Sequence, residues 1–298
     1  MEIGMPQYRE MRHASLVHGD AARIADVSFD SSLDTSSKVH GRLFFPGDKS
    51  SSRPRGCLMH LHGGGFVAGT AKGQSDARLL RHATNCDLAV LSVDYRLSPE
   101  HAHPAALLDS VAAALWLDSP AGRAAARIGE KQPLLLVGES AGGTLAAGVL
   151  TRLRDEHGSP ELFRAVAMTY GWYDLALTPF ARAWGERRLL STADELRWFR
   201  DHYVGPGFPP ERLRDPDVSP LYAQLGGLPP ALFSIGTQDA LLEDSLFMYA
   251  RWLASGNDAT LRVYPGAAHG VGHFGPHQFT EQGEQVLSVL EAFYSEHL

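Results

Sequence analysis

The chain has 298 residues, which corresponds to about two domains of ordinary size or to one enlarged domain. Hydrophobic residues make up 44% and charged residues 20%, a balance that excludes a disordered chain, and the net charge of −7 argues against a nucleic-acid-binding surface. No apolar run approaches the ~20 residues of a membrane helix. Charged residues near the start, where a signal peptide would be apolar, and the expected reduced state of Cys57 and Cys86 predict a cytoplasmic protein.

Short apolar strands alternate with helical patterns along most of the chain. The loosely alternating residues 25–45 predict a leading hairpin. Further strands are expected at 57–61, 88–95, 133–137, 165–170, 230–236 and 259–264. Helices are expected at 75–84, 104–117, 141–156, 243–255 and 279–297. Continuous apolar strands separated by helices predict the α/β fold class, with a mostly parallel central sheet and helices on both faces.

Residues 172–222 interrupt this alternation. They combine many aromatic residues with many charges, and only 193–203 has helical spacing, with no strand pattern. An insertion at the carboxyl ends of the strands would overhang the place where α/β sheets bind ligands, so we expect a helical cap or lid. An ordinary surface excursion is the alternative, although surface loops rarely carry so many aromatic residues.

A serine between glycines, Gly138-Glu139-Ser140-Ala141-Gly142, follows the expected strand 133–137 and opens a helix. This strand–turn–helix setting is typical of a nucleophile elbow, in which the serine occupies a strained turn and small neighbours are needed because the backbone packs closely. The alternative is that Ser140 only caps a glycine-flanked helix. We predict that Ser140 is a catalytic nucleophile.

A nucleophilic serine needs a base, which an acid orients. On this kind of sheet the chain order is serine, acid, histidine. Asp239 directly follows the expected strand 230–236, and His269 follows 259–264 through a loop of small residues, so we predict that they are the acid and the base. Other candidates lie further from their strand ends: Glu243 and Asp244 for the acid, and His273 and His277 for the base.

Three glycines follow His62 at the end of the expected strand 57–61. Without side chains, their backbone N–H groups can approach a substrate oxygen, and with the N–H of Ala141 they would form an oxyanion hole. A dinucleotide fingerprint, Gly63-x-Gly65-x-x-Ala68 with Asp94 at the end of the next strand, is the alternative. In that fingerprint a helix follows the glycines. Here Gly69 and Thr70 stand where the helix should run, which disfavours a nucleotide-binding site.

Five segments in chain order resemble the hormone-sensitive-lipase family of α/β-hydrolases, in particular its bacterial acetyl esterases and short-chain carboxylesterases. They are HLHGGGFVAG, DYRLSPEHAHPAAL, GESAGG, SPLYAQLGGLPPAL and YPGAAHG. The resemblance implies an α/β-hydrolase fold with a helical cap and a triad of Ser140, Asp239 and His269. It also implies oxyanion donors at Gly64, Gly65 and Ala141, with support from His62 and Gly63. The chain has Glu139 where the family commonly has aspartate, and Ala240 where it commonly has proline; neither change removes a catalytic atom.

The resemblance implies a structural role for Asp94 and Glu100, whose segment braces the oxyanion loop and the nucleophile turn. A glycosidase pair is improbable because both carboxylates lie in one short segment. The 14 histidines first suggest a metal, since two sets have ligand-like spacing. These are His60-x-His62 and His269-x3-His273-x3-His277. No carboxylate completes a ligand motif, so we expect no metal and no cofactor.

We therefore expect one hydrolase domain over residues 1–298, with cap or lid elements at 1–24 and 172–222. Its predicted reaction is hydrolysis of short-chain acyl esters through an acyl-enzyme, with a small-molecule ester as partner and a homodimer as a candidate assembly. An amidase or lactonase with the same triad is the alternative, followed by a non-catalytic small-molecule receptor on the same fold.

Overall fold

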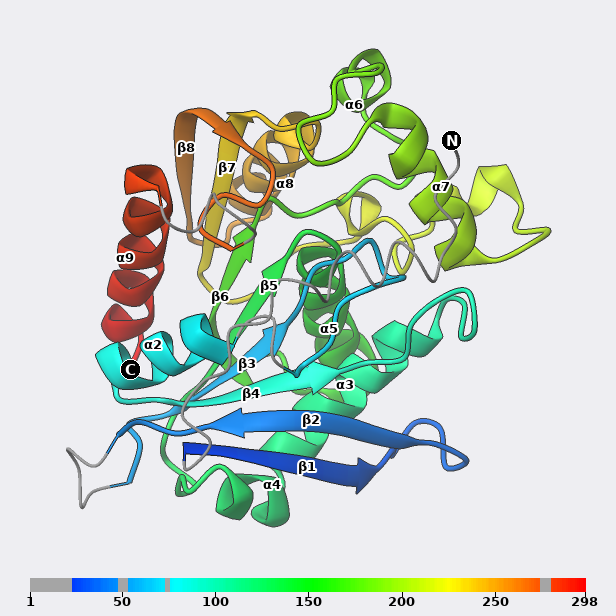
Figure 1. The fold of residues 1–298 in the computed structure, drawn as a ribbon. Coiled ribbons are helices and arrows are strands. Elements are labelled where there is room, and N and C mark those ends of the chain that lie inside the picture. Colours follow the sequence, from blue (N-terminus) through cyan, green and yellow to red (C-terminus); the bar gives the residue numbers. More distant parts are fainter. Residues whose placement is uncertain (1–22, 48–52, 73–75, 274–279) are drawn as a thin grey trace.

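A computed structural model describes residues 23–47, 53–72, 76–273 and 280–298 (Figure 1). Within these ranges the core is an eight-stranded sheet with strand order β1-β2-β4-β3-β5-β6-β7-β8. The strands are β1 (Ile24–Asp30), β2 (Lys38–Phe44), β3 (Cys57–Leu61), β4 (Ala89–Asp94), β5 (Leu134–Glu139), β6 (Phe163–Thr169), β7 (Ala231–Gln238) and β8 (Ala259–Ala268). The helices are α2 (Asp76–Cys86), α3 (Ala105–Asp118), α4 (Pro120–Ala125), α5 (Ala141–His157), α6 (Pro179–Ala183), α7 (Ala193–Val204), α8 (Leu242–Ala254) and α9 (Glu281–Glu296).

The sheet is mostly parallel, as the sequence predicts. The leading hairpin is confirmed, because β1 pairs antiparallel with β2, and β2 pairs antiparallel with β4. All other neighbours, from β4 through β3 to β8, are parallel. Parallel strands end at one edge of the sheet, so the residues that follow β3, β5, β7 and β8 can meet there. None of the described helices is long and apolar enough to cross a membrane.

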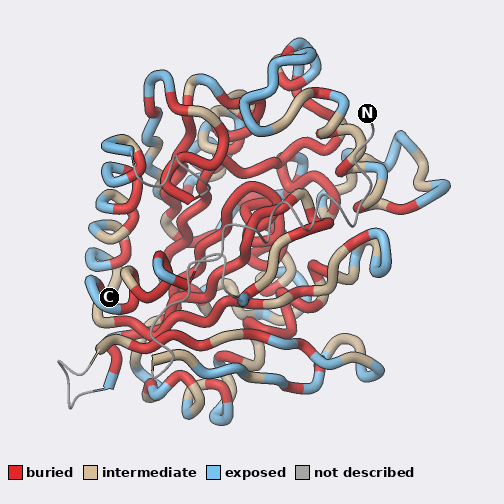
Figure 2. Tube along the Cα trace, viewed as in Figure 1, coloured by how far each residue is buried: buried red, intermediate tan, exposed pale blue. Residues whose placement is uncertain are grey.

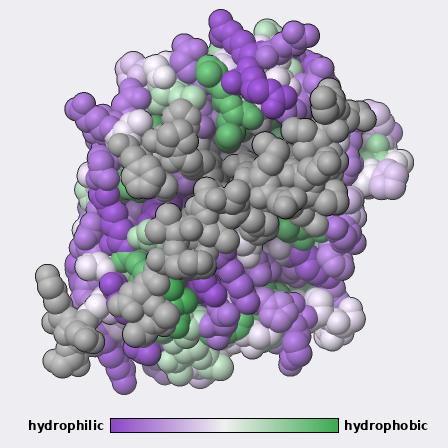
Figure 3. Space-filling model, in the orientation of Figure 1, coloured by the Kyte–Doolittle hydropathy of each residue, from purple (hydrophilic) through white to green (hydrophobic). Residues whose placement is uncertain are grey.

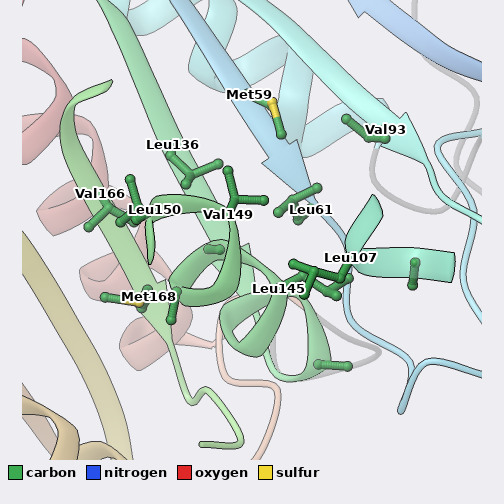
Figure 4. Packing of buried hydrophobic residues seen from close by; sticks show 14 of the residues in the cluster. Met59, Leu61, Val93, Leu107, Leu136, Leu145, Val149, Leu150, Val166 and Met168 are labelled. Carbon is green, nitrogen blue, oxygen red and sulfur yellow. The ribbon is translucent and has the colours of Figure 1, made fainter. Parts of the chain in front are cut away.

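Helices cover both faces of the sheet, which explains the continuous apolar strands. Along β3, Cys57, Met59 and Leu61 pack with the residues of α3, α5 and α8, whereas Leu58 packs on the other face with α2 and α9. Figure 4 shows side chains of α5, among them Val149, turned toward the strands. Figure 2 shows the central strands buried and the outer side of α9 exposed.

The coloured part of one face is mainly hydrophilic. Figure 3 shows apolar patches there between hydrophilic residues. Six large hydrophobic side chains of the described residues are exposed: Leu189, Leu190, Tyr222, Phe247, Leu253 and Val263.

Most element bounds agree with the sequence to within a few residues. Helix α5 begins at Ala141, as predicted, and ends at His157; Gly158 follows as its C-cap, with a left-handed φ of 60° that suits glycine. Two differences matter. Strand β8 continues to Ala268, four residues beyond the predicted end, so His269 follows the strand directly. Helix α4 was not predicted; Ser119 caps it by accepting from the N–H of Gly122.

The insertion between β6 and β7 is helical, as expected. It contains α6, α7 and two 3-10 turns, Pro210–Arg214 and Pro220–Tyr222. In Figure 1, α6 and α7 lie on the side of the sheet toward which the arrowhead of β6 points. The other expected cap element, 1–24, lies outside the described residues except for its last two, and Ile24 begins β1.

Candidate active site

Three side chains from three strand ends meet at the carboxyl edge of the sheet. His269 Nε2 lies 3.0 Å from Ser140 Oγ, and His269 Nδ1 lies 2.8 Å from Asp239 Oδ2. Asp239 is fully buried, and Ser140 and His269 are each 8% exposed. A histidine within hydrogen-bond distance of both a serine and a buried carboxylate is the arrangement that nucleophilic catalysis by serine requires.

The turn at Ser140 is strained and tightly packed. Ser140 has φ 53° and ψ −119°, a region that residues other than glycine rarely occupy. A Cβ at Gly138 would lie 2.1 Å from the carbonyl oxygen of Gly142, and a Cβ at Gly142 would lie 2.0 Å from that of Leu61. Both glycines are therefore needed because backbone atoms fill the space of a side chain, as the sequence predicts.

The aspartate is held from two sides. The backbone N–H of Leu241 donates to Asp239 Oδ1 over 2.9 Å, which leaves Oδ2 for the histidine. The bond to Asp239 makes the Nδ1 nitrogen of His269 the proton carrier, so that Nε2 can accept a proton from Ser140.

The rival acids and bases bind elsewhere. Asp244 Oδ1 accepts from the backbone N–H groups of Tyr173 and Asp174, both over 2.8 Å, and burial raises the pKa of Asp244 to about 8. Glu243 accepts from the backbone N–H of Phe180. The Nδ1–H of His273 donates to a backbone carbonyl. The remaining rival, His277, lies outside the described residues.

The glycine loop after β3 lies beside Ser140. Gly64 and Gly65 have φ values of 131° and 61°, which only glycine adopts without strain. His62 Nδ1 donates to the carbonyl of Gly63 over 2.9 Å, and the Tyr95 hydroxyl donates to the carbonyl of His62 over 2.6 Å. The pKa of His62 falls to about 4 because the side chain is buried. A neutral imidazole therefore supports the loop.

The third expected oxyanion donor is at the start of α5. Ala141 is the first residue of this helix, where no preceding turn offers a carbonyl to the N–H.

The dinucleotide alternative is wrong, because residues 69–72 are not helical and α2 begins only at Asp76. Asp94 instead accepts from the backbone N–H of Ala71 over 3.0 Å, which fits a bracing role. Glu100 lies on an exposed turn.

Comparison with known proteins identifies the family. Residues 58–273 match a family model described as alpha/beta hydrolase fold. The chain belongs to the alpha/beta hydrolase family. The resemblance to its hormone-sensitive-lipase branch is confirmed by the relatives, which are esterases.

Two curated relatives and one solved structure illustrate the similarity of this hydrolase to known proteins. It is 32% identical over 246 residues to an acetyl-hydrolase of Streptomyces hygroscopicus, covering 79% of this chain and 74% of the relative. It is 31% identical over 291 residues to an ethyl acetate hydrolase of Pseudomonas putida, covering 95% and 87%. A thermostable carboxylesterase cloned from a metagenomic library superposes with a TM-score of 0.85 at 29% identity, covering 99% and 96%.

Behind the nucleophile, the hydrolase buries a charged cluster that sequence reasoning missed. Glu139 Oε1 lies 2.7 Å from His60 Nε2, 2.6 Å from Arg78 Nη2 and 3.8 Å from His273 Nε2. Burial alone would raise the pKa of Glu139, but Arg78, His273 and His60 hold it well below its ordinary value. The available signal was His60 within the apolar strand expected at 57–61, together with Glu139 just after the strand expected at 133–137.

Of the histidines that suggested a metal, four belong to these protein networks: His60, His62, His269 and His273. The fifth, His277, lies outside the described residues. His60 Nδ1 lies 2.8 Å from the hydroxyl oxygen of Ser92, while its Nε2 faces Glu139. His62 supports the glycine loop, and His269 contacts Ser140 and Asp239. Among the described residues, no three histidine, cysteine, aspartate or glutamate side chains form a group that could hold a metal ion.

The insertion of this hydrolase lines the pocket beside Ser140. The cavity has a volume of about 20 Å³ and is bordered by Ser140, Gly65, Asp239 and His269 on the side of the sheet. The insertion contributes Trp172, Leu189, Leu190, Ser191, Leu196 and Phe199. The sequence predicted that this segment overhangs the site but did not identify which of its side chains reach it.

Proposed function

We propose that this hydrolase cleaves short-chain acyl esters with Ser140 as nucleophile, His269 as base and Asp239 as the orienting acid. The observation that carries the proposal is the continuous chain of hydrogen bonds from Asp239 through His269 to Ser140. The chain is a carboxylic ester hydrolase, and the relatives named for acetyl and ethyl acetate hydrolysis support short acyl groups. They do not favour an amidase, a lactonase or a non-catalytic receptor.

The first half of the reaction acylates the enzyme. His269 Nε2 takes the proton of the Ser140 hydroxyl while Oγ attacks the ester carbonyl carbon. The N–H groups of Gly64, Gly65 and Ala141 stabilise the tetrahedral oxyanion, a contribution of roughly 3–4 kcal/mol per donor in comparable sites. The C–O bond to the alcohol then breaks, and the Nε2 proton passes to the departing oxygen.

The second half returns the serine. A water molecule attacks the acyl-enzyme carbonyl as His269 takes one of its protons, and the same N–H groups hold the second oxyanion. The bond to Ser140 Oγ then breaks, Oγ regains the proton from His269, and the carboxylic acid leaves. Asp239 stays ionised throughout and stabilises the imidazolium that forms in each half. The balance of atoms requires only the ester and water.

The architecture around this site is part of the proposal. Residues 172–222 act as a cap on a single hydrolase domain, supported by the insertion residues that line the cavity. We place the protein in the cytoplasm, supported by Cys57 and Cys86, which are both buried and free. A homodimer is proposed through β8, the outer strand of the described sheet, where Val263 is exposed.

The test of function is ester hydrolysis by the wild type and a Ser140→Ala variant. We expect the wild type to hydrolyse p-nitrophenyl acetate and butyrate, and the variant to lose at least about 10³-fold in kcat/KM. Ser159→Ala is the control, because Ser159 lies before β6 at the opposite edge of the sheet. Undiminished activity of Ser140→Ala, or no ester hydrolysis by a folded wild type, would contradict the proposal.

A further inference from the structure

Helix α7 of the insertion presents one buried face toward the glycine loop. Leu196, Phe199 and Tyr203 are at most 5% exposed and lie on one side of the helix, at spacings of three and four residues. Leu196 and Phe199 border the cavity beside Ser140. The other side of the helix carries charged side chains such as Asp194, which is exposed.

Two aromatic contacts place α7 directly on the oxyanion loop. A Cβ on Gly65 would lie 2.6 Å from Cδ1 of Phe199, so the ring of Phe199 occupies the side-chain position that glycine leaves empty. One turn further along, the ring of Tyr203 stacks on that of Phe66, with centroids 3.8 Å apart and planes 17° apart. The N–H of His103 donates to the carbonyl of Tyr203 over 2.7 Å, which anchors the end of the helix.

The chemistry of the site determines which part of the ester faces this helix. In the proposed reaction the carbonyl oxygen points to the N–H groups of Gly64, Gly65 and Ala141, and the alcohol oxygen must reach His269 Nε2. The remaining substituent of the carbonyl carbon is the acyl chain. It has to point away from His269, into the part of the cavity that the insertion lines, and Phe199 is one of these lining residues.

The room left on this side is small. The whole cavity, which also borders His269, measures about 20 Å³, which is space for roughly one water-sized group such as the methyl of an acetyl group. We propose, on the basis of the function proposed above, that Phe199 sets the upper size of the acyl group and restricts this esterase to acetyl and similarly small acyl esters. Because the same ring packs on Gly65, it also positions an oxyanion donor.

Graded substitutions at Phe199 test this inference. The measurement is kcat/KM for p-nitrophenyl acetate, butyrate and hexanoate with the wild type, Phe199→Leu and Phe199→Ala. We expect the wild type to prefer acetate, and the hexanoate-to-acetate ratio to rise at least about tenfold in Phe199→Ala, with a smaller rise in Phe199→Leu. Acetate turnover should fall, because Gly65 loses its packing partner.

A matched control separates this role from general loss of packing. Phe180 is an aromatic residue of the same insertion that packs against Trp184 and does not border the cavity. Phe180→Ala should have the same hexanoate-to-acetate ratio of kcat/KM as the wild type. If thermal unfolding shows that Phe199→Ala is not folded, Phe199→Leu decides the question.

The outcomes distinguish the inference from the function on which it rests. An active wild type whose chain-length ratio does not change in the folded Phe199 variants overturns the role of Phe199 and leaves the esterase intact. An equal change of the ratio in Phe180→Ala also overturns it. A folded wild type that hydrolyses none of the three esters instead contradicts the proposed function.

Discussion

Arg78 Nη2 lies 2.6 Å from Glu139 Oε1 in a pair whose side chains are 5% and 1% exposed. Glu139 immediately precedes Ser140, so this buried ion pair holds the last residue of β5 directly behind the proposed nucleophile. The carboxylate also contacts His60 of β3 and faces His273, four residues after His269. One side chain thus connects the three segments that carry the nucleophile, the glycine loop and the base.

Removing the charge of Glu139 should destabilise the fold. Glu139→Gln removes the carboxylate that lies 2.6 Å from the buried Arg78, and we expect the free energy of unfolding to fall by about 3 kcal/mol. Urea unfolding followed by circular dichroism measures the change. Glu284→Gln is the control, because Glu284 pairs with Arg81 at the surface and its side chain is 58% exposed. That variant should lose no more than about 1 kcal/mol of this free energy. Equal losses in the two variants would show that the buried ion pair stabilises the fold no more than the exposed one.

Mild acid should lower the free energy of unfolding because several histidines are buried. Burial lowers the pKa of His62 to about 4, of His103 to about 4 and of His273 to about 3. In the unfolded chain these groups titrate near ~6.5, so below that pH the unfolded state binds more protons. Their stabilising effect is therefore complete above about pH 6.5 and is lost as the pH falls toward 4. Asp244 has the opposite effect. Its pKa is raised to about 8 in the folded protein, so between about pH 4 and 8 the folded state binds one proton more at this group than the unfolded state.

The measurement is the free energy of unfolding in urea between pH 4.5 and 8. We expect the free energy of unfolding to decrease as the pH falls below about 6.5. Its slope against pH should be smaller in His103→Gln, by an amount that corresponds to at most one bound proton. Above pH 7.5 the slopes of His103→Gln and wild type should agree, which serves as the internal control. A stability that rises on acidification from pH 6.5 to 5 would refute this account of the histidines.

The role of Asp239 can be separated from that of its acidic neighbours. In Asp239→Asn the side-chain amide faces His269 Nδ1 and favours the wrong tautomer, so kcat should fall by roughly 10³–10⁴-fold with little change in KM. Glu243→Gln is the matched control, since it can still accept from the N–H of Phe180. It should stay within a few-fold of wild type. A comparable loss in both variants would remove the case for Asp239 as the orienting acid.

The glycine at position 142 should tolerate no side chain. A Cβ there would lie 2.0 Å from the carbonyl oxygen of Leu61, so Gly142→Ala must push β3 away from the nucleophile turn. We expect a loss of about 1–3 kcal/mol or more in stability and a drop in kcat. Gly226→Ala is the comparison, because its nearest heavy atom would lie 3.7 Å away. Retained stability and activity in Gly142→Ala would show that the turn is looser than these contacts imply.

Local pattern was enough to predict the fold class and the three residues that meet at the sheet edge. Ser140, Asp239 and His269 each follow an apolar strand, and parallel strands place their carboxyl ends together whatever the details of packing. The bounds of β8 were less predictable. Pro265 and Gly266 are typical of a loop, but pairing with β7, after a register shift between Gly236 and Gln238, extends the strand to Ala268.

The sequence favoured Asp239 over its rivals by its place at the strand end, and the tertiary structure shows what the rivals do instead. Asp239 and Asp244 are both acidic and close in the chain, and only the packing of α8 against residues 173 and 174 directs Asp244 away from His269.

The sequence by itself determined the order of strands and helices, the glycine-lined turn at Ser140 and the chemical types at the site, because these depend on spacing within single segments. The tertiary structure alone decided that Glu139 pairs with Arg78 and that Phe199 rests on Gly65. Each of these contacts joins segments far apart in the chain, and no local periodicity records which side chains meet when the sheet and its insertion pack together.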